Sequence, residues 1–514
     1  MSAPMKGLKQ ENILLGLEGC VFIFSVSVVV CQIFSNQSYL LTGFLIGQLS
    51  TLLFYHLNYK TTENSIYRVG ADNGVLCCML IPIAVIADVN SSSTDFHANS
   101  RWEKDGILVS VVTAVTLLLT FLNCSTESSN TGKILQGLTT LTLLPLLSSS
   151  SYGEIALCLF LTSISVFINK KLPYILPRCF TFGELFTTSQ LLILISWRII
   201  HTVLLTSETP SASSADIFCS VGVTGLLIAT ILSYLLNTSL HPIIFYIIYS
   251  ALTVVFIVPV LYIYLQEFPL VWLIKFIFKS YSRVLLLCYW IGCSVLAGSI
   301  VGYYNTTREG CQISTIVRKY FHLVVVAVYI PGLAVDVEFL YLSSVVAMAF
   351  LIILETVRVC NIPPFGNLID QSFDVFTDER DQGVIVLTHL YLLIGLSLPL
   401  WISESLSTGC NICLYSGVLS LGIGDTVASL AGSTIGRLKW PGTMKTVEGT
   451  VCSIVIQCLV VYISYYLGIF VIINQWNVLA AILLTSLLEA FTTQIDNLVL
   501  PIAMFALLSV SENP

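Results

Sequence analysis

Residues 242–265 read PIIFYIIYSALTVVFIVPVLYIYL, an apolar run without a single charged side chain. A run of this length can cross the hydrocarbon core of a bilayer as one helix. Its apolar residues are continuous rather than alternating, which favours a helix over a β-strand. Because lipid offers the backbone no hydrogen bonds, a chain built from such runs is expected to form spanning helices.

The rest of the chain repeats this pattern. The protein has 514 residues, of which 56% are hydrophobic and 10% are charged, and its mean hydropathy is +0.90. Soluble proteins carry roughly 25% charged residues. Apolar runs recur from 12–34 to 497–510, and their lengths predict roughly 14–17 membrane segments. The sequence therefore predicts an all-α polytopic membrane protein.

Composition also narrows the functional classes. The net charge of −7 and the lack of a long basic run indicate no nucleic-acid partner. Most of the 16 cysteines lie inside apolar runs, where cysteine acts as a small hydrophobe. Cys410 and Cys413 form a C-x-x-C pair without a second pair or a nearby histidine, so a zinc site is not expected. We expect 12–34 to be a retained first span rather than a removed signal peptide.

The two halves of the chain differ in where their polar residues lie. Before about residue 305 they fall mainly in short loops, whereas afterwards ionisable residues gather at span ends and enter the spans. An ionisable group inside a membrane is costly and by default marks a functional site. We therefore expect residues 1–305 to be a multi-span scaffold and residues 306–514 to form the catalytic region.

The stretch 422–449, GIGDTVASLAGSTIGRLKWPGTMKTVEG, interrupts the apolar pattern most sharply. Taken as a helix, its first part places Asp425, Ala428, Gly432 and Gly436 on one face. The glycines by themselves are explained by close helix packing, since small residues let membrane helices approach. Packing needs no carboxylate, so Asp425 favours a polar ligand lying against a bare helix face, with a metal ion held by the acid.

The second part of this stretch is predicted to be a loop. Pro441 and Gly442 form a turn signal. Lys445 and Thr446 directly precede the next apolar helix, and a helix N-terminus with a lysine suits a phosphate group. Glu448 is either a partner of the helix dipole or a ligand contact. The basic residues also fit the positive-inside rule, which places the loop in the cytosol.

Further ionisable residues lie beside the neighbouring spans. EAFTTQID, residues 489–496, sets Glu489 and Asp496 on one helical face, where two acids could hold Mg²⁺ together with phosphate oxygens. RKYFHL, residues 318–323, brings His322 to the entry of a span as a general base or a phosphate contact. A hydrogen-bonded structural histidine and ordinary juxtamembrane charges are the alternatives there.

Two more charged groups have structural alternatives. Glu355 and Arg358 are three residues apart, which favours an ion pair within one helix. FTDERDQG contains a charged cluster before a span that is either solvated at the interface or part of a metal site; it consists of Asp378, Glu379, Arg380 and Asp381. Carboxylates, a lysine and a helix N-terminus at one membrane face are typical of phosphoryl or nucleotidyl transfer, where positioning and charge neutralisation dominate catalysis.

The motif 424–450, GDTVASLAGSTIGRLKWPGTMKTVEGT, resembles the CTP-binding signature of dolichol kinases. RKYFHL, FTDERDQGVIVLTHLYLLIGLSLPLW and LLEAFTTQIDNLVLP look like the same family. The resemblance covers about residues 314–505, and the first half carries no motif of the family that we identify. It implies an enzyme of the endoplasmic reticulum membrane that transfers the γ-phosphate of CTP to dolichol, giving dolichyl phosphate for protein glycosylation, with the CTP-binding loop in the cytosol.

The resemblance also implies roles for individual residues. The nucleotide-binding set carried over to this sequence is Gly424, Asp425, Ala428, Gly432, Gly436, Lys445, Thr446, Glu448 and Gly449. The catalytic residues expected are Asp425, Lys445 and His322. A divalent ion, expected to be Mg²⁺, would be held by Asp425 with Glu489 or Asp496. His322, Asp378 or Asp381 would orient the dolichol hydroxyl.

Three other functions fit parts of the pattern. A CTP-dependent cytidylyltransferase acting on phosphatidate shares a Lys-Thr-x-Glu-Gly element, and kinases of phytol or farnesol use shorter isoprenoids. An ion-coupled transporter would use Asp425, Glu489 and Asp496 for coupling. The chain lacks the internal repeats typical of such transporters, and its lysine-bearing loop suits a phosphate instead.

Overall fold

The computed structural model describes residues 16–30, 39–58, 66–68, 73–91, 100–122, 130–141, 152–204, 213–236, 242–307, 315–374, 381, 383–403 and 411–509. Within these ranges the protein is helical and contains no strand, only two isolated β-bridges. Seven of the described helices are long and apolar enough to cross a membrane, and nine further apolar helices are shorter. The prediction of an all-α polytopic membrane protein is confirmed.

The chain forms two compact units, which are described separately. The first comprises Met1–Ile195 and Ile402–Pro514, and the second comprises Ser196–Trp401. This partition does not coincide with the functional division expected near residue 305, because the C-terminal segments pack with the N-terminal ones. The assignment of scaffold and catalytic roles stays a prediction.

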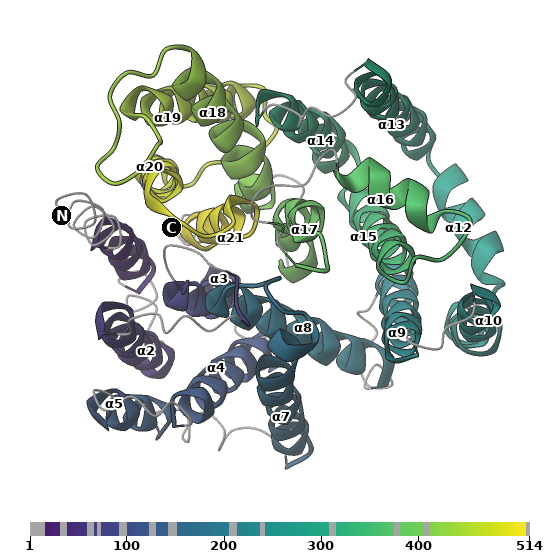
Figure 1. Ribbon diagram of the computed structural model, residues 1–514, viewed down its shortest axis with the longest axis horizontal. Helices are drawn as coiled ribbons and strands as arrows, with labels where there is room; N and C mark the ends of the chain where they lie inside the picture. The colour runs from purple at the N-terminus through teal and green to yellow at the C-terminus, as the bar shows by residue number, and fades with distance from the viewer. Residues whose placement is uncertain are drawn as a thin grey trace. The chain divides into compact units, whose positions relative to one another are not determined.

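The first unit contains the two ends of the described chain (Figure 1). Its N-terminal helices are Gly16–Val30, α2 (Tyr39–Asn58), η1 (Val75–Met79), α3 (Leu80–Ser91), α4 (Ser100–Leu122), α5 (Asn130–Leu141), α7 (Tyr152–Ile175) and most of α8 (Phe182–Leu204). Its C-terminal helices are η6 (Ile412–Tyr415), η7 (Val418–Asp425), α18 (Thr426–Thr434), α19 (Val447–Tyr466), α20 (Gln475–Phe491) and α21 (Asp496–Ser509).

Helix α21 forms the core of this unit. Every residue from Asn497 to Ser509 is buried, and α21 packs against α3, α20, η6 and η7 (Figure 1). Most of the span Ile412–Thr434 is also enclosed, with 89% of an 18-residue apolar window buried. Segments from both ends of the sequence therefore build one core, and the stretch 422–449 begins inside this core.

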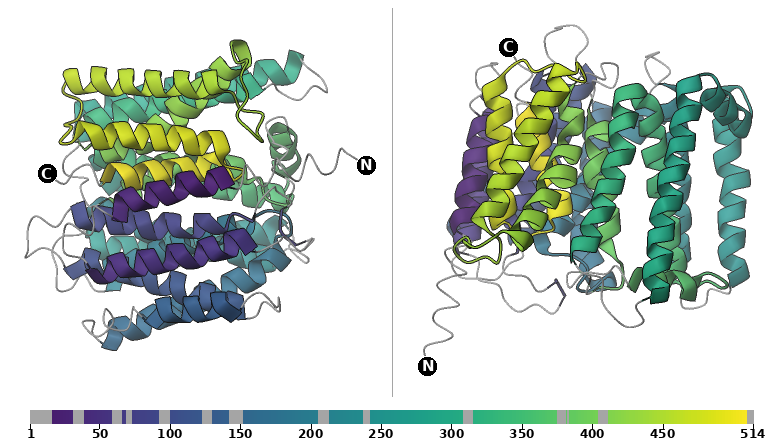
Figure 2. Two further views of the ribbon diagram at one scale, coloured as in Figure 1. Left: turned by 90° about the vertical axis from the view of Figure 1, so that its left-hand side faces the viewer. Right: turned by 90° about the horizontal axis from the view of Figure 1, so that it is seen from above.

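The second unit contains α9 (Ser214–Leu235), α10 (Pro242–Leu252), η4 (Thr253–Ile257), α11 (Val258–Leu265), α12 (Pro269–Phe278), α13 (Tyr281–Thr307), α14 (Thr315–Val335), α15 (Val337–Val359), α16 (Gly366–Asp374) and α17 (Leu387–Ile402). Its long helices run side by side (Figure 2).

The run 242–265 is helical throughout and mostly exposed, as expected of a surface that faces lipid. Its central turn, η4, is a π-helix that ends two residues before Pro259, which has no N–H to continue the regular pattern.

Candidate active site

The span that carries Asp425 changes its helical pitch at that residue. η7 is a π-helix that ends at Asp425, and α18 continues from Thr426 as an ordinary helix to Thr434. Short π-helical segments occur frequently at functional sites. Asp425 is only 2% exposed, so its carboxylate lies inside the unit. The sequence predicted a helix that includes Gly436. The helix α18 ends at Thr434, so Gly436 lies beyond its end rather than on its face.

The glycines of this stretch form a close packing surface. A Cβ atom on Gly432 would lie 2.9 Å from Thr446 Oγ1, and one on Gly436 would lie 2.3 Å from the carbonyl oxygen of Gly432. On the facing helix, a Cβ on Gly449 would lie 2.6 Å from the carbonyl oxygen of Ala428. The small residues therefore let α18 and the start of α19 touch, and Thr446 fills the space that they leave.

The segment between α18 and α19 folds back on itself as a short hairpin. Trp440 N–H donates to the carbonyl of Lys445 at 3.0 Å, and Val447 N–H donates to that of Leu438 at 2.8 Å. At the tip, Thr443 N–H donates to the carbonyl of Trp440 at 3.3 Å, and Gly442 has φ of 80°. Proline followed by a glycine with positive φ is the pattern of a type II turn. The predicted turn at Pro441 and Gly442 is confirmed.

The N-terminal turn of α19 is capped by its own side chains. Thr446 Oγ1 accepts a hydrogen bond from Gly449 N–H at 3.2 Å. The Glu448 carboxylate accepts from Leu438 N–H, at 3.0 Å and 3.1 Å to its two oxygens. The first amides of this helix are thus partly satisfied within the hairpin. Glu448 braces the hairpin, and as the acid in the first turn of α19 it also lies where the helix dipole favours a negative charge. Its contact with a metal or ligand stays a prediction.

Trp440 anchors the hairpin to the end of α20. Its indole N–H donates to Thr450 Oγ1 at 3.0 Å, and its ring packs edge-on against Phe491 at 5.2 Å between centroids. Phe491 is the last residue of α20. This contact brings the C-terminal arm of the hairpin beside the junction of α20 and α21.

At that junction the Lys445 ammonium group meets two carboxylates. Lys445 Nζ lies 2.9 Å from Glu489 Oε1 and 3.7 Å from Asp496 Oδ2, and it also donates to the backbone carbonyl of Glu489. Glu489 and Asp496 do not share one helix, because α20 ends at Phe491 and α21 begins at Asp496. The expected single helical face is wrong, and the helix break is what turns both acids toward one lysine.

The carboxylates control the charge of Lys445. Burial alone lowers the pKa of its amine, but the negative charges of Asp496, Glu489 and Asp425 outweigh burial, so the pKa is raised above its usual value. Among the charges that raise this pKa, that of Asp425 contributes least. The charged form of Lys445 is therefore favoured chiefly by Asp496 and Glu489.

The donor set fits a metal ion shared with a ligand better than a closed metal cage. Among the described residues, no group of three or more histidine, cysteine or acidic side chains is arranged to hold a metal ion. Mg²⁺ is commonly bound by one or two carboxylates and the phosphate oxygens of a substrate. The metal role expected for Asp425 with Glu489 or Asp496 stays a prediction.

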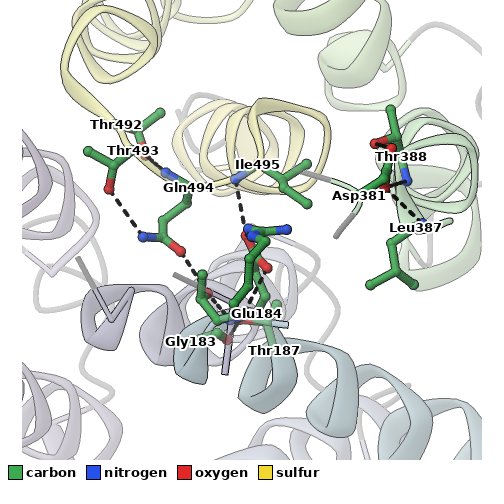
Figure 3. A network of polar contacts seen from close by, with 12 residues as sticks. Gly183, Glu184, Thr187, Asp381, Leu387, Thr388, Thr492, Thr493, Gln494 and Ile495 are labelled. Atoms are coloured by element: carbon green, nitrogen blue, oxygen red, sulfur yellow. Dashed lines mark hydrogen bonds and ion pairs between the residues drawn. The ribbon is translucent and has the colours of Figure 1, made fainter. Parts of the chain in front are cut away.

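The other predicted site residues belong to the second unit. His322 lies in α14 and is 8% exposed. The Asp381 carboxylate accepts hydrogen bonds from Leu387 N–H at 3.2 Å and from Thr388 Oγ1 at 2.7 Å, so it caps the start of α17 (Figure 3). Asp378, Glu379 and Arg380 lie outside the described residues. The catalytic role of His322 stays a prediction.

Glu355 and Arg358 form the ion pair that their spacing predicted. The Arg358 guanidinium lies 2.7 Å from Glu355 Oε1 and 3.0 Å from Asp370 Oδ1. Glu355 Oε1 also accepts from Val386 N–H at 2.7 Å. These contacts tie the end of α15 to the segments around α16 and the start of α17, which is a structural role.

Sequence reasoning missed the partners that support the junction of α20 and α21. Arg68 and Glu184 form a buried ion pair in the first unit, with side chains 4% and 0% exposed. The sequence signal that could have identified this pair was a charged residue at the boundary of a predicted span. It lies in the half of the chain that we interpreted as scaffold. Nothing local in the sequence connects these residues to Glu489 or Asp496.

We predict that Gly449→Ala disrupts the packing of α18 on α19. The new methyl group would press on the backbone carbonyl of Ala428, which cannot move aside as a flexible side chain would. Thermal unfolding of the detergent-solubilised protein should shift down, consistent with a loss of about 1–3 kcal/mol from overpacking. Gly292→Ala is the matched control, because a Cβ there has nothing within 4 Å. Equal stability of the two variants would contradict the packing interpretation.

Comparison with known proteins identifies the family. A family model described as dolichol kinase matches residues 61–397, so the likeness includes much of the half in which we found no motif. The dolichol kinase of Homo sapiens is 36% identical over 469 residues, which are 86% of each chain. That of Mus musculus is 36% identical over 472 residues, again 86% of each chain.

More distant relatives match over a shorter region. The dolichol kinase of Saccharomyces cerevisiae is 31% identical over 242 residues, which cover 46% of this chain and 44% of the yeast protein. No solved structure matches the chain. The extent of the family match and the identity to the mammalian proteins together show that this membrane-embedded enzyme belongs to the dolichol kinase family.

Proposed function

We propose that the protein transfers the γ-phosphate of CTP to the terminal hydroxyl of dolichol, and that the hairpin and helix ends around Lys445 bind the nucleotide. The observation that carries the proposal is the meeting of Lys445 with Glu489 and Asp496, close to Asp425. A permanently charged ammonium group beside carboxylates provides what phosphoryl transfer needs, namely charge neutralisation and a place for a divalent ion. The family membership supports the lipid acceptor.

In this proposal Lys445 binds the β- and γ-phosphates of CTP. Asp425, with Glu489 or Asp496, would hold Mg²⁺, which would supply neutralisation of the phosphate charge. The dolichol oxygen forms a bond to the γ-phosphorus, the bond from that phosphorus to the bridging oxygen of the β-phosphate breaks, and CDP leaves. The hydroxyl proton is released, and little base catalysis is needed where the reactants are well aligned.

The proposed location follows from the substrates. Dolichol is a long isoprenoid that stays in the bilayer, so the enzyme meets its alcohol at a membrane face. We propose the endoplasmic reticulum membrane, with the hairpin on the cytosolic side where CTP is available. Arg437 and Lys439, both exposed on the hairpin, support that orientation by the positive-inside rule.

The decisive experiment supplies purified protein with dolichol and CTP labelled on either the α- or the γ-phosphate. We expect labelled lipid only from the γ-position, because a kinase breaks the bond to the last phosphorus. Label arriving from the α-position would mean nucleotidyl transfer and would overturn the proposal. Omission of dolichol is the control, and it should remove the labelled product.

We predict that Lys445→Met lowers activity by about 10²–10³-fold, the usual cost of losing one electrostatic group at a reacting centre. The methionine side chain is neutral, so it cannot balance the negative charge of the phosphates. Lys439→Met is the matched control, since Lys439 lies on the same hairpin with an exposed ammonium group that contacts only Met444. Initial rates at saturating dolichol would be compared at equal folded protein, and similar rates for the two variants would contradict the role of Lys445.

We also predict that Lys445 produces no alkaline limb in the pH profile. In the folded protein the pKa of Lys445 is raised above its ordinary value. The stabilisation of the fold by its charged form is therefore fully present below the ordinary lysine pKa of about 10.4, and it is lost only as the pH rises through the pKa of the folded protein. The nucleotide KM of wild type and Lys445→Arg should therefore follow the same shape from about pH 6 to about pH 9. A limb present in wild type and absent from Lys445→Arg would contradict this.

A further inference from the structure

The four-residue connection between α20 and α21 is buried, which is unusual for a loop. Thr492, Gln494 and Ile495 are 5%, 0% and 3% exposed, respectively. Loops normally lie at the surface because buried backbone and side-chain polar groups need hydrogen-bond partners. The connection lies between Glu489 and Asp496, the two acids that contact Lys445. The partners of this connection therefore determine where those acids lie.

Several of these partners come from the N-terminal part of the chain. Thr492 Oγ1 donates to Glu18 at 3.0 Å, and Thr181 Oγ1 donates to Gln494 Oε1 at 2.8 Å. The backbone N–H of Ile495 donates to Glu184 Oε1 at 3.3 Å (Figure 3). Ile495 directly precedes Asp496, so the Glu184 carboxylate holds the backbone at the first residue of α21.

Glu184 is itself held by a second layer of contacts. Its other oxygen accepts from Thr181 N–H at 3.1 Å, and Arg68 forms an ion pair with it. The backbone at Arg68 is fixed in turn, because Arg68 N–H donates to the carbonyl of Phe180 at 2.8 Å. Both Glu184 oxygens thus have protein partners, and Arg68 balances the charge.

Glycines allow this segment to approach so closely. A Cβ on Gly183 would lie 1.8 Å from the carbonyl oxygen of Gly74, and a Cβ on Gly74 would lie 2.5 Å from Gln494 Oε1. Gly74 also has φ of 69°, which other residues rarely adopt. The segment before η1, the start of α8 and the connection of α20 to α21 form a single buried polar cluster.

Stability alone does not account for a charged pair at this place. Removing two charges from water is costly, and a buried ion pair can often be replaced by apolar residues of similar volume without loss of stability. What an apolar pair cannot provide is an acceptor for the Ile495 N–H. The carboxylate oxygen therefore has a geometric use as an acceptor at the start of α21.

We infer that Glu184, with its charge balanced by Arg68, is a positioning residue of the phosphotransfer site, which sets Glu489 and Asp496 around Lys445. The inference rests on the function proposed for that lysine. It assigns part of the N-terminal half to the active site without direct contact to substrate. A displacement of about 1 Å at a reacting centre can cost about 10²-fold in rate, so a loosened connection is sufficient to impair nucleotide use.

The test compares two double variants that both remove the charges. Arg68→Met with Glu184→Leu fills the space with apolar atoms but leaves the Ile495 N–H without an acceptor. Arg68→Met with Glu184→Gln keeps an amide oxygen that can accept it. We expect the leucine variant to raise the KM for CTP about tenfold, the size of effect expected from one lost buried hydrogen bond, and the glutamine variant to rescue most of that loss.

Two readouts separate positioning from general stability. The KM for dolichol should change little, and the melting temperature of the leucine variant should fall only by what one unsatisfied buried N–H costs, about 1–3 kcal/mol. Hydrogen exchange at residues 492–499 should nevertheless accelerate about tenfold while exchange elsewhere stays near that of wild type. Glu267→Gln is the matched control, because it neutralises an exposed ion pair with Lys275 at 2.7 Å. If the leucine variant does not fold, Glu184→Asp, which keeps the charge but withdraws it by one methylene, is compared with wild type by the same two readouts.

The outcomes distinguish the inference from the proposed function. Unchanged exchange at 492–499 and an unchanged KM for CTP, in a folded leucine or aspartate variant, would overturn the positioning role. A glutamine variant as impaired as the leucine variant would overturn it too, because the acceptor would then be irrelevant. Full activity of Lys445→Met would instead overturn the proposed function, while the exchange measurement would still report whether Glu184 fixes the connection.

Discussion

The ammonium group of Lys445, set between Glu489 and Asp496, joins the hairpin to the ends of α20 and α21. It is carried there by a hairpin, which is itself anchored by Trp440 on the last residue of α20. The acids turn toward it because the chain breaks between α20 and α21. Remove that charge pairing, and two carboxylates remain near each other in a largely apolar surrounding, which is strongly unfavourable.

The membrane setting explains why many of the surrounding polar groups form hydrogen bonds. In lipid and in a protein core, an unpaired donor or acceptor costs far more than in water. Thr446 and Glu448 therefore satisfy amides around the hairpin, and Glu184, Thr181 and Glu18 satisfy the connection behind it. The same pairing that makes the site compatible with its surroundings also makes it rigid, and phosphoryl transfer depends on rigid placement of charges.

The packing of the glycines changes the interpretation of the signature motif. Gly432, Gly436 and Gly449 serve the contact between α18 and α19, centred on Thr446. This does not remove them from nucleotide binding, because the close contact fixes where the hairpin leaves the membrane helices. In the proposed function their contribution to nucleotide binding is indirect, through the position of Lys445.

The sequence by itself determined the helical membrane class, the turn at Pro441 and Gly442, the ion pair of Glu355 with Arg358, and the family resemblance. Each depends on apolar run length, on residues close together along the chain, or on a contiguous motif. Only the tertiary structure decided that Lys445 pairs with Glu489, 44 residues away, and that Thr181 bonds Gln494, 313 residues away. Local patterns specify helices and turns, but the choice of partners between helices depends on how they pack, which one sequence read locally does not contain.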